Sequence, residues 1–266
     1  MFGQTTERGR RGLTVIELLL AISLLAVVVG TLAALAQAVQ TARQYSQCNG
    51  GAVEEARMVL ARITRTAQGA HANPRFPGFL VVTEQMGPWR FPDTLVVWRP
   101  LDEAADPAGL PRFDELVVYC PDPEGPERLI ELTVPKDHRV VPPPEDLAAW
   151  RSAVRAMQRA AKSQRVELTR LVHTAVVAGS ANSSRRAAVR FERRLRPSDE
   201  EWAEYQAGSR GWEDLSWAQS IYGPQTGLSQ VWLRMEMQLV PRDTTGALRR
   251  PIPFFGSAAL YYLVQR

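Results

Sequence analysis

The chain has 266 residues, 45% of them hydrophobic, and its 32 basic and 28 acidic residues leave a formal net charge of +4 at pH 7. This excess is too small to indicate an anionic partner by charge alone. The chain has only three histidines and two cysteines, so it offers few side chains for metal binding or nucleophilic chemistry.

A short basic segment opens the chain. Residues 1–12 include Arg8, Arg10 and Arg11 and end in Gly12. Short flanks rich in arginine tend to remain in the cytoplasm. We therefore expect a cytoplasmic leader, with the rest of the chain on the other side of any membrane that the next segment crosses.

A nearly unbroken apolar run follows this leader. Leu13–Ala36 contains one carboxylate, Glu17, among apolar, small and hydroxyl residues. As a helix rising about 1.5 Å per residue, the run would extend roughly 36 Å, which exceeds a hydrocarbon core of about 30 Å. A secretory signal peptide is disfavoured, because its apolar region has about 7 to 15 residues and ends at a small-residue cleavage site. The run predicts a transmembrane helix over 13–39.

The carboxylate inside this run requires a partner. An ionised side chain near the centre of a span costs roughly 2.5 to 3.5 kcal/mol, and less near the end of the span. If the chain is cut after Gly12, Leu13 gains a free amino group four residues before Glu17, which is one helical turn. Amine and carboxylate can then meet within one chain or between staggered neighbours.

The order of Gly12, four apolar or small residues, Glu17 and a long apolar stretch resembles the type III signal of type IV prepilins and type II secretion pseudopilins. The resemblance implies that a prepilin peptidase cleaves between Gly12 and Leu13 and methylates the new N-terminus. It also implies that Glu17 guides each subunit into a growing fibre. Leu13 departs from the usual Phe of the family but keeps this position apolar. A plain signal anchor with an accidental glutamate is the alternative.

Helical spacing continues beyond the span, over 40–70. Two interior glycines in Asn49-Gly50-Gly51 cost about 2 kcal/mol relative to alanine, so we expect a kink or an unwound turn near 49–51. This half of the helix should pack on a globular domain, as the family resemblance also implies. Its apolar face recurs at spacings of three and four: Val53, Ala56, Leu60, Ile63 and Ala67.

Short apolar runs bounded by prolines dominate 71–266. Together with two longer alternating runs, they predict a mainly antiparallel sheet. The predicted strands are 79–82, 95–98, 116–119, 129–134, 189–195 and 231–239.

A different pattern separates the two groups of predicted strands. Glu145–Lys162 has apolar residues at helical spacing, which predicts an amphipathic helix and a helical insertion near 145–178. Residues 166–177 are compatible with either helix or strand. Residues 180–184 are expected to form a loop, and the acidic stretch 197–201 is expected to start a helix.

These elements predict an α+β, pilin-like fold, in which a long N-terminal membrane-spanning helix packs on a mainly antiparallel β-sheet domain with a helical insertion. The strand at 189–191, the tryptophans Trp212 and Trp217, and the strand at 231–239 resemble J-type minor pseudopilins. The chain is also longer than an ordinary major pilin, which favours a minor subunit.

The remaining reactive side chains do not predict catalysis. Cys48 and Cys120 could form one disulfide in an oxidising compartment. Alternatively they stay free thiols, because Cys48 lies soon after the span. The histidines His71, His138 and His173 fall in no HExxH or GxSxG pattern. The C-terminal region lacks the six to eight oxygen ligands that calcium takes. We therefore expect no enzyme activity, metal or cofactor.

Arginines are frequent between residues 185 and 196. A nucleic-acid site of this kind would interleave them with several aromatic side chains, and this stretch has one, Phe191, which alternates away from Arg190 and Arg194. The stretch is therefore interpreted as a solvated, charged strand face, and no nucleic-acid partner is expected.

The sequence as a whole predicts a minor pseudopilin of a type II secretion system. It would be a single-pass protein of the bacterial inner membrane, with its C-terminal domain in the periplasm, and would join a periplasmic fibre after assembly. The expected partners are a prepilin peptidase, other pseudopilins or pilins through the N-terminal helix, the inner-membrane assembly platform and membrane lipid. Two alternatives stay open. One is a type IV pilus minor pilin in adhesion or DNA uptake, and the other is a single-span anchored periplasmic binding or enzymatic domain.

Overall fold

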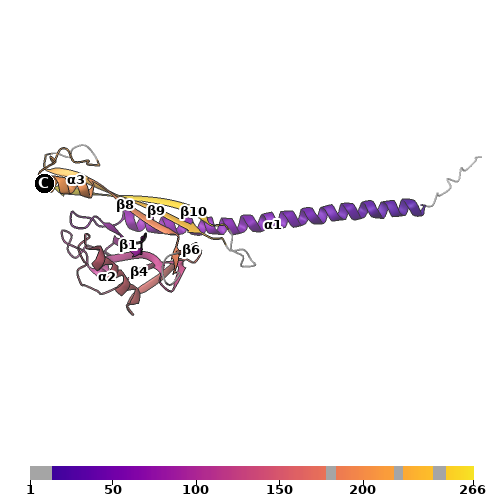
Figure 1. Ribbon diagram of the computed structural model, residues 1–266, viewed down its shortest axis with the longest axis horizontal. Coiled ribbons are helices and arrows are strands. Elements are labelled where there is room, and N and C mark those ends of the chain that lie inside the picture. Colours follow the sequence, from indigo (N-terminus) through magenta and orange to yellow (C-terminus); the bar gives the residue numbers. More distant parts are fainter. Residues whose placement is uncertain (1–13, 178–183, 219–223, 242–249) are drawn as a thin grey trace, which may run out of the picture. The chain divides into compact units, whose positions relative to one another are not determined.

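The computed structural model describes residues 14–177, 184–218, 224–241 and 250–266 (Figure 1). The chain divides between Asn49 and Gly50 into two compact units. Helix α1 (Val15–Gln68) contributes to both units. Every strand found in these described ranges belongs to the second unit.

Helix α1 is helical through Asn49-Gly50-Gly51, so the expected unwound turn is not found. A Cβ atom added at Gly50 or Gly51 would meet nothing within 4 Å, which shows that no close packing requires glycine there. The conformational cost of the two glycines is small compared with the hydrogen bonds and packing of the turns that follow them.

A five-stranded antiparallel sheet forms the first layer of the second unit. Its strands run in sequential order, β1-β2-β3-β4-β5. Helix α2 (Leu147–Arg159) lies in the chain between β4 and β5, and a short 3-10 helix (Phe113–Glu115) precedes β3. The strands are β1 (Phe79–Met86), β2 (Trp89–Trp98), β3 (Leu116–Asp122), β4 (Gly125–Thr133) and β5 (Gln164–Thr169).

A second antiparallel sheet has three strands in the order β10-β9-β8. Helix α3 (Asp199–Gln206) joins β8 (Val189–Arg196) to β9 (Thr226–Leu239), and β10 (Ile252–Gln265) forms one edge. A separate two-stranded ladder pairs β6 (Thr174–Val177) with β7 (Ser184–Ala187).

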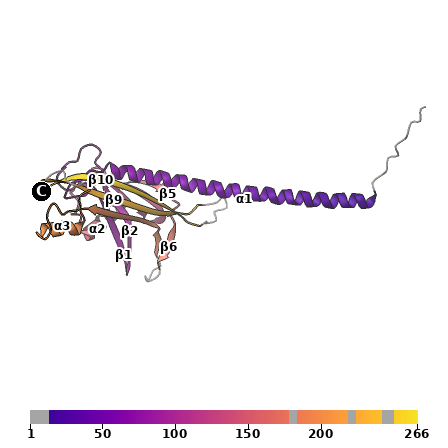
Figure 2. The same cartoon turned by 90° about the horizontal axis from the view of Figure 1, so that it is seen from above.

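The alternation of side chains along the strands creates two apolar clusters. One cluster joins the second part of α1 to both sheets, and it includes Ile63, Leu95, Tyr119 and Leu233. In Figures 1 and 2, β9 and β10 run alongside this part of α1. The opposite face of the five-stranded sheet forms the other cluster with α2, where Trp150 is fully buried.

Most predicted elements are confirmed. All six predicted strands are present, the helix predicted from residue 145 is α2, and the helix start predicted at 197–201 is α3, capped by Ser198. The predicted helical insertion near 145–178 is wrong beyond Arg159, because 164–169 and 174–177 are strands. Of the expected loop at 180–184, residues 180–183 lie outside the described residues, and Ser184 begins β7.

The buried face of α1 differs slightly from the predicted one. Ala56, Ile63 and Ala67 are buried as expected, whereas Val53 and Leu60 are only partly buried. Ala52 and Val59 are buried in addition. The buried face keeps its helical spacing and is shifted toward the residues that come one position before Val53 and Leu60. Because this face belongs to the cluster shared with both sheets, the expectation that this half of the helix packs on the sheets is confirmed.

Replacing Ile63 by alanine should destabilise the second unit by about 2–5 kcal/mol, since the side chain is fully buried between α1 and the two sheets. Denaturant unfolding of the full chain in detergent, followed by tryptophan fluorescence, measures this loss. Met58 lies on the same helix and is 63% exposed, so Met58→Ala should change stability by less than about 0.5 kcal/mol. Equal losses in the two variants would contradict the packing described.

Candidate functional site

Helix α1 begins with a reciprocal cap between Thr14 and Glu17. The backbone N–H of Glu17 donates to Thr14 Oγ1 over 3.3 Å. Glu17 Oε2 accepts from the backbone N–H of Thr14 at 2.9 Å and from the Thr14 hydroxyl at 3.0 Å. This is a capping box, in which an N-cap threonine and a glutamate three residues later satisfy each other's backbone donors. The glutamate also lies at the positive end of the helix dipole.

The cap leaves part of the carboxylate available. Both bonds from Thr14 end on Oε2, and no hydrogen bond from the described part of the chain reaches Oε1. Glu17 is exposed. Gly12 and Leu13, where cleavage and methylation are predicted, lie outside the described residues. The structure therefore places the predicted assembly carboxylate on the first turn of α1, with one oxygen open to a further donor.

The first part of α1 exposes apolar side chains around its whole circumference. Every residue from 14 to 47 is exposed, and Ile16 and Leu25 keep 79% and 62% of their accessible surface. By length and composition, α1 can cross a membrane. A soluble helix normally buries one apolar stripe against its own protein, and a helix that is apolar all round is typical of a membrane span.

The hydroxyl groups inside this apolar segment are satisfied within the helix. Ser23 donates to the carbonyls of Leu19 and Leu20 at 3.0 and 2.9 Å, and Thr31 donates to Val28 O at 2.8 Å. Hydrocarbon offers no hydrogen-bond partners, so polar groups in a span must find theirs within the protein. These three bonds fit that requirement.

Cys120 carries a free thiol and is fully buried on β3, on the face of the sheet that packs against α2. Burial raises the pKa of this thiol to about 12, although the contact from Gln158 opposes the shift. The group is therefore protonated at neutral pH and unreactive. The side chain of Cys48 lies outside the described residues, and the free thiol of Cys120 gives no support to a disulfide between them.

The histidines hold local contacts in the second unit. His71 Nε2 lies 3.1 Å from Pro107 O, and its ring packs edge-on against Trp98. His138 Nδ1 lies 2.8 Å from Asp114 Oδ2. The backbone N–H of His173 donates to Gln238 O at 2.7 Å. Within the described ranges, no group of three or more His, Cys, Asp or Glu is placed to hold a metal ion.

A polar pocket of about 470 Å³ contains an unusual carboxyl group. Asp93 of β2 is 6% exposed, accepts from the Thr94 hydroxyl at 3.3 Å and lies 4.0 Å from a guanidinium nitrogen of Arg186 on β7. The Arg186 guanidinium also lies over the Phe91 ring, 5.2 Å from its centroid. Burial raises the pKa of Asp93 from 3.8 to about 6, against the opposing effects of Arg186 and Thr94.

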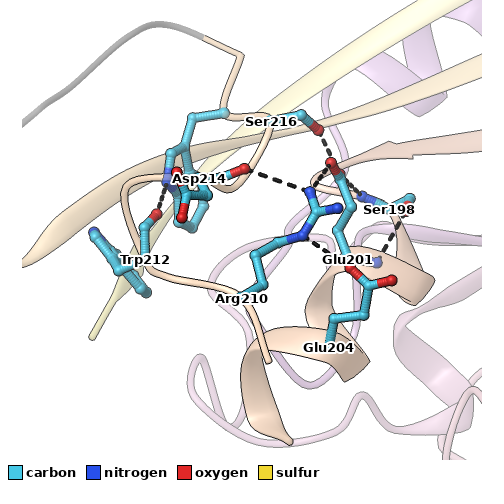
Figure 3. A network of polar contacts seen from close by, with 8 residues as sticks. Ser198, Glu201, Glu204, Arg210, Trp212, Asp214 and Ser216 are labelled. Carbon is cyan, nitrogen blue, oxygen red and sulfur yellow. Dashed lines mark hydrogen bonds and ion pairs between the residues drawn. The ribbon is translucent and has the colours of Figure 1, made fainter. Parts of the chain in front are cut away.

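A second polar network fixes the loop after α3 (Figure 3). Glu201 accepts from the backbone N–H of Ser198, from the Ser216 hydroxyl and from Arg210. Arg210 also donates to Glu204 at 2.8 Å. The hydrogen bond from Ser216 is the main reason that the pKa of Glu201 is lowered, with Ser198 next.

This network supports a group of packed aromatic rings. Trp212 and Trp217 have ring centroids 4.7 Å apart, and Trp202 and Tyr205 of α3 pack around them. Trp217 donates its indole N–H to Trp212 O at 3.1 Å. The two tryptophans that carried part of the sequence resemblance are thus structural residues, which join α3 to the end of β10 through Val264.

Comparison of the chain with protein-family models, with curated proteins and with solved structures finds no match. Its function has to be inferred from the chemistry of its own residues.

Two features of these sites were not predicted from the sequence. The first is the capping box, although its signal is present in the sequence as the spacing Thr14-x-x-Glu17. The second is the burial of Asp93. Asp93 follows a proline at the start of an apolar run, and its burial and the approach of Arg186 from β7 are seen only in the structure. Burial of this kind depends on contacts between distant parts of the chain.

Asp93 makes the stability of the second unit depend on pH. Its folded pKa is raised, so the folded state binds the proton more tightly, and this contribution weakens as pH rises from about 4 through 6. Relative to the wild type, the free energy of unfolding of Asp93→Asn should rise by about 1–3 kcal/mol between pH 4.5 and pH 7.5, because only the wild type has to keep a buried carboxylate at the higher pH. Denaturant unfolding at the two pH values measures the difference.

Asp137→Asn is the matched control. Its neighbour Arg139 lowers the pKa of Asp137, so this carboxyl stays ionised in both folded and unfolded chains above pH 4.5. The difference between this variant and the wild type should therefore not change between pH 4.5 and 7.5. A pH-independent effect of Asp93→Asn would show that the Asp93 carboxyl is not desolvated.

Proposed function

We propose that the chain is a membrane-anchored, pilin-like assembly subunit, a minor pseudopilin of a type II secretion pseudopilus. In this proposal a prepilin peptidase cleaves between Gly12 and Leu13 and methylates the new N-terminus. The observation that carries the proposal is the isolated carboxylate of Glu17, on the first turn of a helix that is otherwise apolar and exposed on all sides.

The chemistry of Glu17 supports a role in assembly. Thr14 satisfies one carboxylate oxygen, while the other has no partner in the described residues. Cleavage after Gly12 would create an ammonium group on Leu13, four residues before Glu17. Pairing the two charges, within one chain or between neighbours, removes the cost of leaving a carboxylate alone in hydrocarbon. Pairing between neighbours would then favour a subunit that enters the fibre over one left unpaired in lipid.

The two parts of α1 would have separate tasks. Before assembly the exposed apolar part would lie in lipid, and in the fibre the same surface would pack against the helices of other subunits. The part beyond Gly50 is already packed on the two sheets through Ala56, Ile63 and Ala67. The β-rich unit would thus be presented outside the membrane, to neighbouring subunits or to cargo.

The proposal also specifies where the chain is located in the cell and which proteins it binds. The chain would be a single-pass protein of the bacterial inner membrane, with its leader in the cytoplasm and its β-rich unit in the periplasm. The prepilin peptidase would act first. The inner-membrane assembly platform and the other pseudopilins would then bind the processed helix. No catalytic step is assigned to the chain.

Glu17→Ala tests this function in cells that carry the cognate fibre-assembly proteins. Leader cleavage should be unchanged, because the cut lies outside the first helical turn. Incorporation into sheared or cross-linked fibres should fall at least about tenfold, since the N-terminal ammonium group loses its partner. The measurements are the mobility of the processed chain and its amount in the fibre fraction.

Ser23→Ala serves as the control in the same helix. Ser23 is a polar residue of the apolar segment whose hydroxyl is satisfied by its own backbone, so this variant should assemble normally. Normal incorporation of Glu17→Ala would refute the role assigned to the carboxylate. Loss of incorporation by Ser23→Ala as well would mean that any polar change in the helix is disruptive.

A further inference from the structure

Strand β10 is a long, open edge. It spans Ile252–Gln265 and lies at one end of the three-stranded sheet, where β9 is its one partner among the described strands. The register with β9 is regular from Ile252 opposite Leu239 to Gln265 opposite Thr226, with no bulge. Figure 2 shows it beside β9, along the outside of the sheet.

The pairing of β9 shows which main-chain groups of β10 face away from the sheet. Leu228 O accepts from Ala218 N, and Gln238 exchanges bonds with Ala188 and His173, so Leu228 and Gln238 direct their main chain away from β10. Their partners on β10, Leu263 and Pro253, must then direct theirs to the open side. The same holds for every second residue of β10. Six of them form the outward row considered below, and the terminal Gln265 is the seventh. The six are Pro253, Phe255, Ser257, Ala259, Tyr261 and Leu263.

The main-chain groups of this row have no partner in the part of the chain that the structure describes. No backbone hydrogen bond from another described segment reaches any of the six residues. Their side chains share the outer face of the sheet, where Phe255, Tyr261 and Leu263 keep 57%, 52% and 56% of their accessible surface. The edge therefore combines free hydrogen-bonding groups with exposed apolar side chains.

Charge distinguishes this edge from the other outer strands of the two sheets. Natural proteins protect exposed edges with charged residues, bulges, prolines or short strands. Strand β1 has a bulge and Glu84, and its Thr83 carbonyl accepts from Arg151. The six-residue β5 carries Arg165 and Glu167, and β8 carries four arginines. Strand β10 has 14 residues, none of them charged, and a single proline near its start.

We propose that the open edge of β10 binds an extended, uncharged strand of a different protein subunit, which extends the sheet by one strand. Only another strand supplies donors and acceptors at the spacing of the six outward residues. The partner strand must be uncharged where it faces β10, because β10 offers no opposite charge to pair with. The interface would be built from main-chain bonds and from apolar contacts with Phe255, Tyr261 and Leu263.

A second copy in the same membrane does not fit this edge by antiparallel pairing. The part of α1 beyond Gly50 runs along β10, and Leu60 lies against Gly256. Antiparallel joining of two β10 strands would place the two Gly50 ends at opposite ends of the joined sheet. Given the membrane anchoring proposed above, both copies could not enter one bilayer. Antiparallel pairing with a second anchored copy is thus excluded, and the proposal assigns the edge to a strand of a different subunit.

A free peptide with the sequence of residues 252–265 is a suitable probe, because it is uncharged and has no anchor. In antiparallel register it would place Phe255 opposite its Tyr261, and Ser257 opposite its Ala259, all on the outer face. The measurement is residue-resolved amide hydrogen exchange of the full chain in nanodiscs, with and without the peptide, its ends blocked.

Binding at the edge should slow exchange at Phe255, Ser257, Ala259, Tyr261 and Leu263 by at least about tenfold. The alternate residues of β10, already bonded to β9, should not change. A peptide with lysine in place of its Ser257 and Ala259 should give no protection.

Two variants of the chain complete the test. Ser257→Lys should abolish protection, since it places a charge on the outward row. Gln238→Lys puts the same charge on the same face of the sheet but on the middle strand, and should leave protection intact. Absence of protection at saturating peptide, or equal protection by the lysine peptide, would overturn the proposal. Neither result would affect the proposed role of Glu17, which is measured by fibre incorporation.

Discussion

A helix that exposes apolar side chains all around its axis is not stable in water, and this constraint governs the first unit. Residues 14–47 are exposed throughout, and the helix starts with a carboxylate already bonded to its own N-cap. Lipid or other helices of the same kind can satisfy such a surface. A segment that either environment can satisfy fits the function proposed above, in which the subunit would leave the membrane to enter a fibre.

Beyond Gly50 the same helix buries one face against its own domain. Small and branched side chains, among them Ala56 and Ile63, are buried against two sheets, and the charged residues of this part stay outside. The second unit therefore has its own core and a second cluster beneath α2. Its polar features, Asp93 in a pocket and Glu201 in the α3 network, stabilise or tune the fold. The surface proposed to bind a partner is the uncharged edge of β10.

The sequence predicted much of this structure, because Pro-bounded and alternating runs identify strands with one buried face. Strand β10 was not predicted. Phe255, Tyr261 and Leu263 are apolar although they lie on the exposed face, so the strand lacks the alternation of apolar and polar residues that indicates a half-buried strand. The exposed apolar side chains that obscured the strand in the sequence are thus the ones that would contact a partner at its edge. The glycines at 50 and 51 predicted a break that continued helical bonding overrides. Of the proposed assembly site, Glu17 was predicted from its position in the apolar run, whereas the convergence of both Thr14 donors on one of its two oxygens was not.

The central claim is that the leader is removed so that the amino group of Leu13 can meet Glu17. Mass spectrometry of the N-terminal peptide, after co-expression of the chain with a prepilin peptidase, tests this most directly. A methylated peptide that begins at Leu13 is the result expected of a fibre subunit. An intact leader that begins at Met1, under conditions where a known prepilin is processed, would contradict the account and favour a static membrane anchor.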